Sequence, residues 1–429
     1  MSASTTTLVP SESPAGAVRP GAFGNAAALA CRECGARQPL GALFACLDCF
    51  GPLEVVYADD IVLSREQIAA GPHNIWRYQP LLPVPVDVAS FPSTEPGMTR
   101  LVRADNLARE LGIRTLWVKD DSNNPTHSFK DRVVAVALTA ARELGFRVLA
   151  CPSTGNLAGA TAAAAARAGI RSVVLVPKDL EPQKVLTTAV YGGTLVCVDG
   201  TYDDVNRLAI EIAGEQADWA FVNVNVRPYY SEGSKTLAFE VAEQLGWRLP
   251  EQVVVPVASG SQLTKIDKGF GELGGLGLVE PTPCRVFGAQ ATGCSPVATA
   301  FAAGHDVVRP VRPDTIAKSL AIGDPADGPY VLDITRRTGG AVESVSDEEI
   351  RAGIALLART EGIFGETAGG VTIATLKKLV DGGRLDPDAE TVVFNTGDGL
   401  KTLDAVADAV GPTATIAASY DAFVSAGLL

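Results

Sequence analysis

The residue best suited to do chemistry is Lys130, which lies in the stretch Asn-Pro-Thr-His-Ser-Phe-Lys-Asp-Arg at residues 124–132. Pro125 removes a backbone donor and fixes its own φ, and Ser128 is a candidate N-cap, so the stretch predicts a turn followed by a helix. An apolar run at residues 133–138 follows at once. Burial beside such a helix would lower the pKa of Lys130 toward the free amine that forms a Schiff base. The alternative is an ordinary solvated lysine at a helix start.

Three loops rich in glycine and small polar residues each follow a predicted strand. They are residues 153–156 after strand 147–151, residues 257–262 after strand 253–257, and residues 395–400 after strand 391–394. Ligands of open α/β sheets bind beyond the carboxyl ends of the strands, and backbone N–H groups at a helix start bind anions. Each loop alone is typical of an ordinary cap or turn. Together with Lys130, the three loops indicate a site for a phosphate-bearing ligand.

The elements that must position these residues alternate along the chain. Further predicted strands are 115–119, 172–176, 194–198 and 221–224, and predicted helices include a short one at 101–112 and a long one beginning at Glu232. Such alternation predicts parallel sheets with helices on both faces. The sequence therefore indicates an α/β fold.

Four of the eight cysteines form two C-x2-C pairs, Cys31 with Cys34 and Cys46 with Cys49. Two such turns facing each other supply the tetrahedral thiolate set that a structural zinc ion prefers, and four sulfur ligands leave no open position for catalysis. We therefore predict a zinc ribbon at residues 29–58. A ribbon that folds without metal and a redox pair are the alternatives. The four other cysteines are scattered, which argues against a secreted disulfide scaffold and favours the cytoplasm.

Composition limits the classes of partner. A chain of 429 residues is too long for one core, and its formal net charge of −13 argues against nucleic acid as a partner. No run of eighteen apolar residues occurs, so no membrane span is expected. Residues 1–28, rich in Ser, Thr, Pro, Ala and Gly, lack the basic start and apolar core of a secretory signal and predict a disordered tail.

Five segments, in collinear order, resemble threonine synthases, which belong to the tryptophan-synthase-β-like group of pyridoxal-phosphate enzymes. The segments are residues 124–132, 153–156, 232–236, 361–364 and 396–401, and the resemblance runs from about residue 75 to 406. It implies the type II fold of these enzymes, with two doubly wound sheet subdomains and the active site between them. The catalytic domain would span residues 59–429, with a smaller, mobile subdomain at roughly 140–235. A four-cysteine ribbon also precedes the catalytic domain in some members.

The resemblance also implies roles for single residues. Lys130 would hold pyridoxal 5′-phosphate covalently and move protons, Asn156 would bond the ring hydroxyl, and Thr396 would bond the ring nitrogen. The cofactor's phosphate would lie on the backbone of one loop, made of Ala258, Ser259, Gly260, Ser261 and Gln262. The substrate's phosphate would face Ser153, Thr154, Gln262 and Arg227.

The implied reaction converts O-phospho-L-homoserine and water to L-threonine and phosphate, and relatives are often homodimers. The chain departs from the family pattern at several positions. His127 stands where glycine is usual, the loop at 258–262 lacks a paired Gly-Asn, Asp324 replaces a frequent asparagine, and the family's phosphate-binding arginine falls near Arg227 or Tyr230. Two alternatives therefore remain: a related enzyme acting on phosphoserine, serine or threonine, and a non-catalytic binding protein.

Overall fold

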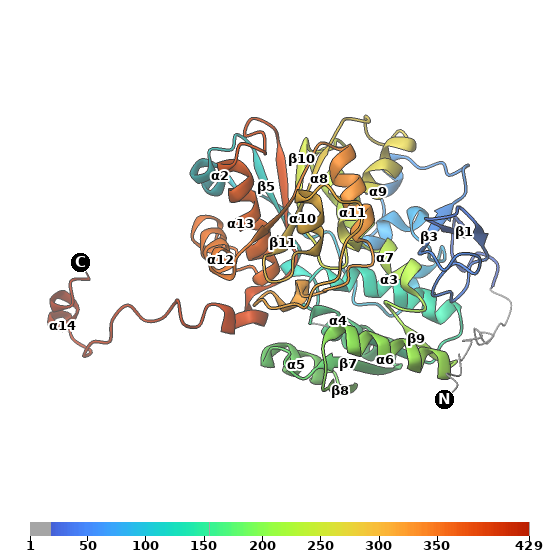
Figure 1. Cartoon of the computed structure of the whole chain (residues 1–429), viewed down its shortest axis with the longest axis horizontal. Helices are drawn as coiled ribbons and strands as arrows, with labels where there is room; N and C mark the ends of the chain where they lie inside the picture. The colour runs from blue at the N-terminus through green and yellow to red at the C-terminus, as the bar shows by residue number, and fades with distance from the viewer. Residues whose placement is uncertain (1–18, 154, 429) are drawn as a thin grey trace.

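Three sheets organise the part of the chain that the structure describes (Figure 1). The computed structural model describes residues 19–153 and 155–428. Most of the predicted N-terminal tail, residues 1–18, lies outside this range.

The N-terminal ribbon is an antiparallel sheet in the order β2-β1-β3, made of β1 (Ala26–Cys31), β2 (Arg37–Gln38) and β3 (Leu53–Tyr57). β1 begins three residues before the expected ribbon boundary at residue 29. Phe23, in front of it, is buried and stacks on Tyr229 with ring centroids 4.8 Å apart. The ordered ribbon is therefore longer than the sequence indicated.

The largest sheet has six strands in the order β12-β11-β10-β13-β5-β4. Its strands are β4 (Arg100–Arg103), β5 (Leu116–Asp120), β10 (Gln252–Pro256), β11 (Arg285–Ala291), β12 (Val342–Val345) and β13 (Thr391–Asn395). All pairs are parallel except β4 with β5. Alternating side chains face opposite layers: Val253 and Val255 lie in the core with α8 and α9, whereas Val254 lies in the core with α12 and α13.

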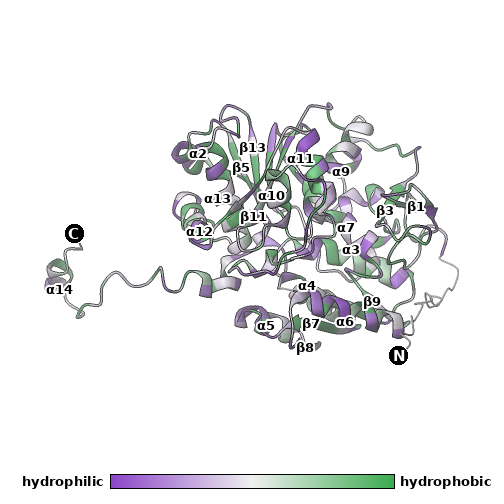
Figure 2. Cartoon of the chain, in the orientation of Figure 1, coloured by the Kyte–Doolittle hydropathy of each residue, from purple (hydrophilic) through white to green (hydrophobic). Residues whose placement is uncertain are grey.

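A smaller sheet of four parallel strands lies in the order β8-β7-β6-β9. Its strands are β6 (Val148–Pro152), β7 (Arg171–Pro177), β8 (Thr194–Val198) and β9 (Trp219–Phe221), all within the predicted smaller subdomain. Leu149 and Cys151 face the core shared with α4, and Val148 and Ala150 face α6. The strands of both α/β sheets are largely apolar in Figure 2, as expected for parallel sheets covered on two faces.

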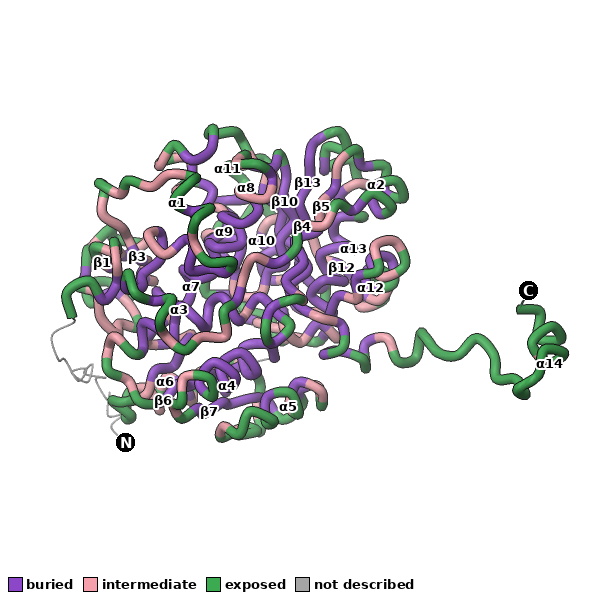
Figure 3. The backbone as a smooth tube through the Cα atoms, turned by 180° about the vertical axis from the view of Figure 1, so that it is seen from behind, coloured by how far each residue is buried: buried purple, intermediate pink, exposed green. Residues whose placement is uncertain are grey.

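Helices complete the two layered parts. The α-helices are α1 (Arg65–Ala69), α2 (Asp105–Leu111), α3 (Lys130–Glu143), α4 (Asn156–Ala168), α5 (Pro182–Ala189), α6 (Tyr202–Glu215), α7 (Arg227–Glu232), α8 (Lys235–Gln244), α9 (Ser261–Gly275), α10 (Pro296–Ala302), α11 (Gly328–Arg337), α12 (Asp347–Glu361), α13 (Thr367–Asp381) and α14 (Tyr420–Ser425). Five short 3-10 helices are η1 (Ile75–Leu81), η2 (Val88–Ser90), η3 (Asp121–Asn123), η4 (Lys318–Leu320) and η5 (Gly399–Ala405). From residue 407 the chain extends away from the body and is almost entirely exposed (Figure 3). Of the helices described, none combines the length and apolarity that crossing a bilayer requires.

The start of α3 differs from the prediction. Phe129, not Ser128, occupies the N-cap position, and it forms no side-chain cap. Phe129 N–H donates to the Thr396 carbonyl at 3.0 Å, and Ser128 pairs with Gly397 in a β-bridge. The residues before α3 are therefore paired with the loop after β13, which leaves Ser128 in an extended segment rather than at a cap.

Three other boundaries differ from the prediction, two of them at contacts between residues far apart in the sequence. Residues 101–103 of the expected helix 101–112 belong to β4, since they pair with β5. β9 ends at Phe221 because the Asn225 side chain accepts the Phe221 N–H at 2.8 Å. The expected long helix at Glu232 is two helices, α7 and α8, joined at Gly233. A Cβ at Gly233 would lie 2.6 Å from the carbonyl oxygen of Arg132, so glycine is needed for this close approach to α3.

A buried ionic network fixes the first turn of α3. Arg132 is fully buried, and its guanidinium donates to both carboxylate oxygens of Asp121 at 2.7 and 2.9 Å and to the carboxylate of Glu240. Lys119 Nζ also donates to Glu240, at 2.7 Å. Although burial acts in the opposite direction, Arg132 and Lys119 lower the pKa of Glu240 to about 2. The network ties α3 to β5, η3 and α8, two residues after Lys130.

We expect Arg132→Met to lower the free energy of unfolding by about 3–5 kcal/mol, because it leaves the buried carboxylate of Asp121 without a cation and that of Glu240 with Lys119 alone. Urea unfolding followed by circular dichroism measures the change. Arg142→Met, at the exposed end of the same helix, loses the same charge and should cost about 1 kcal/mol or less. Equal losses in the two variants would contradict the importance of the network.

Candidate active site

A cavity of about 520 Å³ lies between the two α/β sheets, at the carboxyl ends of their strands. Its walls include residues that follow β6, β10 and β13, as expected for ligand sites of parallel sheets. The described residues with predicted cofactor or substrate roles all line this cavity: Lys130, Ser153, Asn156, Arg227, Ala258, Ser259, Gly260, Ser261, Gln262 and Thr396. Thr154 lies outside the described residues. The sequence thus grouped these residues correctly in space.

Lys130, the first residue of α3, is partly accessible from the cavity. Burial lowers its pKa to about 8, with the carboxylate of Glu366 acting in the opposite direction. Its Nζ donates to the hydroxyl of Tyr230 at 3.1 Å. Burial also raises the pKa of Tyr230, so the phenol stays neutral. Lys130 therefore loses its proton far more readily than an ordinary lysine, and its hydrogen-bond partner is neutral.

Asn156 connects the two α/β parts beside Lys130. Its amide nitrogen donates to both carboxylate oxygens of Glu366, at 2.7 and 2.8 Å, and its carbonyl oxygen accepts from Lys401 Nζ at 3.1 Å. Asn156 begins α4, whereas Glu366 and Lys401 belong to the larger part. The three side chains are buried. The amide that the resemblance places at a ring hydroxyl is thus held by a carboxylate and an ammonium.

The loop at residues 258–262 forms a cradle at the start of α9. Gly260 has φ +96°, and a Cβ there would lie 2.8 Å from Val331 and 2.9 Å from Asp327, so only glycine suits the position. The side-chain nitrogen of Gln262 is buried in the cavity wall and finds no partner within the described residues. An unpaired buried donor beside a helix N-terminus fits an anionic ligand.

The two other loops present different chemistry. The Ser153 hydroxyl accepts from the N–H groups of Gly155 and Ala158, each at 3.0 Å, so it also acts as a cap for α4. Thr396 is buried and directly follows β13. Its uncharged hydroxyl fits a pyridine nitrogen without requiring that nitrogen to carry a proton.

Arg227 starts α7 and supplies a cation to the cavity wall. Its guanidinium donates to Asp327 Oδ2 at 2.6 Å. Asp327 is buried, and its N–H donates to the Ser259 carbonyl at 2.8 Å. The arginine and the 258–262 loop are therefore held by one aspartate.

His127 is an exposed residue with φ +60°, in the left-handed region that favours glycine. The family's usual glycine at this position thus has a conformational reason. The backbone holds the conformation, since His127 N–H donates to the Asn124 carbonyl at 2.8 Å and Asp398 N–H donates to the His127 carbonyl at 3.1 Å.

The four N-terminal cysteines form one cluster, with their sulfur atoms all within 4.8 Å of one another. Backbone N–H groups of Glu33, Asp48 and Gly51 donate to the sulfurs of Cys31, Cys46 and Cys49, each at 3.4 Å. Such N–H···S contacts favour thiolates, and four thiolates at this spacing fit a tetrahedral zinc ion.

Three features of the site were not predicted. Glu366 directly precedes the buried helix α13, and the motif quoted from the sequence ended two residues before it. Tyr230 was noted only as an alternative position for an arginine. The ribbon residues Phe44 and Phe50 line the cavity, which only the fold could show.

The fold is that of known pyridoxal-phosphate enzymes. Maize serine racemase aligns with a TM-score of 0.59 at 20% identity, over 70% of this chain and 89% of that one. The L-serine ammonia-lyase of Rhizomucor miehei aligns with a TM-score of 0.62 at 21% identity, over 73% of this chain and 98% of that one. At these identities the likeness shows the type II fold alone.

Sequence comparison is more specific. Residues 92–397 match the family described as pyridoxal-phosphate dependent enzyme. A threonine synthase of Methanocaldococcus jannaschii is 38% identical over 87% of this chain and 93% of its own length. That of Methanosarcina acetivorans is 36% identical over 92% and 97%. The chain therefore belongs to the threonine synthase family of pyridoxal-phosphate-dependent enzymes.

Proposed function

We propose that this protein is a threonine synthase, which converts O-phospho-L-homoserine and water to L-threonine and phosphate, the last step of threonine biosynthesis. The observation that carries the proposal is Lys130, a lysine of lowered pKa in a cavity lined by the loops after β6, β10 and β13, one of which holds the unpaired side-chain nitrogen of Gln262. The relatives described above, matched over nearly their whole length, support the same reaction.

Pyridoxal phosphate, when bound, supplies a conjugated ring that takes up electrons as a proton leaves carbon. Lys130 would hold it covalently, Asn156 would face its ring hydroxyl and Thr396 its ring nitrogen. The backbone at 258–262 would bind its phosphate. The unpaired nitrogen of Gln262 and the glycine cradle at residue 260 support this arrangement. A neutral threonine partner suits elimination and replacement better than transamination.

Proton transfer would be the task of Lys130. As a free amine, its Nζ takes the α-proton of the substrate and returns it late in the reaction, which requires a base near neutral pKa. Tyr230, 3.1 Å away, would orient the amine without charging it. Closure of the cavity would exclude water until the addition step.

The substrate's phosphate would lie against Ser153, Gln262 and Arg227. The bond between the γ-carbon and its oxygen breaks to release inorganic phosphate. A β-proton is lost, and the γ-carbon gains a proton and becomes the methyl group of threonine. One water molecule then supplies the hydroxyl at the β-carbon, and its remaining proton goes to phosphate, so the atoms of substrate and water equal those of threonine and phosphate. Binding the phosphate dianion would supply energy for closing the smaller subdomain.

A second candidate is a related enzyme that eliminates or replaces a group on phosphoserine, serine or threonine. The observation that favours it is the Arg227–Asp327 ion pair at 2.6 Å, since an arginine already paired with a carboxylate attracts a dianion less strongly. Activity on a panel of these amino acids distinguishes the two candidates.

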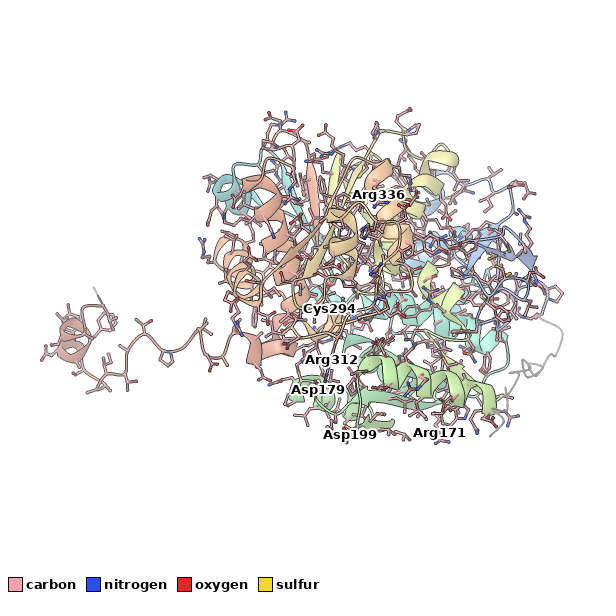
Figure 4. All side chains as sticks on the ribbon, viewed as in Figure 1. Arg171, Asp179, Asp199, Cys294, Arg312 and Arg336 are labelled. Carbon is pink, nitrogen blue, oxygen red and sulfur yellow. The ribbon has the colours of Figure 1, made fainter. Side chains whose placement is uncertain are left out.

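We further propose that the smaller subdomain moves and that the protein is a cytoplasmic homodimer with one structural zinc ion per chain. Polar contacts beside the cavity join the two parts. Lys318 lies 3.3 Å from Asp179, which is labelled in Figure 4, and Lys184 donates to the Ser319 hydroxyl at 3.0 Å. The Lys318–Asp179 pair is exposed and can open at small cost. The cysteine cluster supports the zinc ion, whereas the homodimer rests on the family resemblance alone.

We expect the purified protein, loaded with cofactor, to release phosphate and threonine in equal amounts from O-phosphohomoserine. Lys130→Ala should lower the rate by about 1,000-fold or more, because it removes both the covalent attachment and the base. Lys178→Ala, an exposed lysine of the smaller subdomain, is the matched control and should leave the rate unchanged. A Lys130→Ala protein with normal phosphate release would exclude the proposed role of Lys130.

The lowered pKa of Lys130 predicts how cofactor attachment depends on pH. Only the free amine reacts with the cofactor's aldehyde, so the rate of attachment to cofactor-free protein should rise with pH and level off above about 8. Absorbance after rapid mixing with pyridoxal phosphate measures this rate. An ordinary lysine would give a rate that still climbs near pH of about 10, and that result would be inconsistent with a buried Lys130.

A further inference from the structure

The four-cysteine ribbon forms part of the catalytic cavity. Phe44, Ala45, Phe50 and Pro52 line the same cavity as Lys130. Phe44 and Phe50 are 53% and 84% exposed, so they contribute little to the ribbon's own core. Two large apolar side chains at the mouth of a cavity are therefore available to cover a bound molecule.

The metal-binding turn sets the position of this rim. Phe50 directly follows Cys49 and has φ +60°, a strained conformation for a bulky residue. Its N–H donates to the Cys46 carbonyl at 3.0 Å, and the Gly51 N–H donates to the Cys49 sulfur at 3.4 Å. A Cβ at Gly51 would lie 2.8 Å from the Cys31 sulfur. The backbone that carries Phe50 thus wraps directly around the four sulfurs.

The other turn of the ribbon is tied to α11. The Arg32 guanidinium lies 3.5 Å from the centre of the Tyr330 ring, and the Tyr330 hydroxyl donates to Glu33. Arg32 also pairs with Asp327 Oδ1 at 3.6 Å. Asp327 Oδ2 is the oxygen that holds Arg227, at 2.6 Å. One buried carboxylate is therefore shared by a ribbon arginine and a cavity arginine.

This sharing changes the charge that faces the cavity. Arg227 and Asp327 alone form a neutral pair, whereas Arg32, Asp327 and Arg227 together carry a net charge of +1. Arg32 also competes for the carboxylate and so leaves Arg227 freer to meet an anion. Partial burial of all three groups weakens solvent screening of the effect.

We propose that the ribbon is a wall of the active site: Phe44 and Phe50 close the cavity over the bound substrate, and Arg32 acts through Asp327 as a positioning residue for Arg227 at the substrate's phosphate. The inference rests on the proposed function for the identity of the substrate. The rim formed by Phe44 and Phe50 and the contact of Arg32 with Asp327 are tested separately.

The rim is tested in holoenzyme with Phe44→Ala and Phe50→Ala. Each should raise KM for O-phosphohomoserine about fivefold to tenfold with little change in kcat, because the covering contact is lost. Leu47→Ala is the matched control, since Leu47 is a 55% exposed apolar residue between Cys46 and Cys49, the two cysteines that Phe44 and Phe50 flank. Zinc content, measured by metal analysis, should be equal in all three variants. KM values equal to that of Leu47→Ala would contradict the proposal that Phe44 and Phe50 cover the bound substrate.

The arginine contact is tested with inorganic phosphate, so that it does not depend on turnover. Titration calorimetry of holoenzyme Arg32→Gln should give a phosphate Kd about fivefold weaker than the unaltered protein. Arg37→Gln, an exposed arginine of β2, is the control and should bind phosphate normally. Equal phosphate affinities in the two variants would contradict the proposal that Arg32 acts on Arg227 through Asp327. If Arg32→Gln binds phosphate more weakly and Arg37→Gln does not, but the unaltered protein fails to turn over O-phosphohomoserine, the proposed function is rejected. The proposal that the ribbon forms a wall of the active site then stands.

Discussion

The buried guanidinium of Arg132 is the interaction on which the active site depends. It is fully buried, and such a charge is tolerable only when its donors meet fixed acceptors. Asp121, Glu240, Thr99 and Thr236 provide them, from three different parts of the chain. Because the guanidinium is planar and its donors form a rigid fork, the acceptors fix the orientation of α3 closely. Lys130, two residues earlier on the same turn, is directed into the cavity as a consequence.

Parallel topology brings the remaining groups to Lys130, and one contact joins the two parts at this point. Asn156 follows a strand of the smaller sheet, and Glu366 comes from the larger part. Their two hydrogen bonds, at 2.7 and 2.8 Å, join the two parts in the wall of the cavity that Lys130 also lines. A movement of the smaller subdomain would therefore also move the amide that faces the cofactor. The closure that we propose would therefore be coupled to the contact that we propose between Asn156 and the cofactor.

Local pattern predicted much of this structure. β8 was predicted residue for residue. The loops after β6, β10 and β13 were correctly placed at one site, because a buried parallel strand is an apolar run that ends at glycine or a small polar residue. The wrong predictions concern segments whose structure is determined by contacts with residues far away in the sequence. β4 forms because residues 100–103 pair with β5. Ser128 is not a helix cap because the N–H of its neighbour Phe129 donates to the Thr396 carbonyl. Glu366, Tyr230 and Phe50 carry no local signal, since their importance comes only from what the fold places beside them.

The chain's overall charge gives the ribbon's contact a further meaning. With a formal net charge of −13, the protein as a whole repels the dianionic substrate that we propose. Attraction must therefore come from cations near the cavity, and the charge of Arg227 is balanced by that of Asp327. Arg32 restores it from a module that is far away in the sequence. A ribbon that only stabilised the fold would need no charged group on this carboxylate, so its arginine belongs, in electrostatic terms, to the active site.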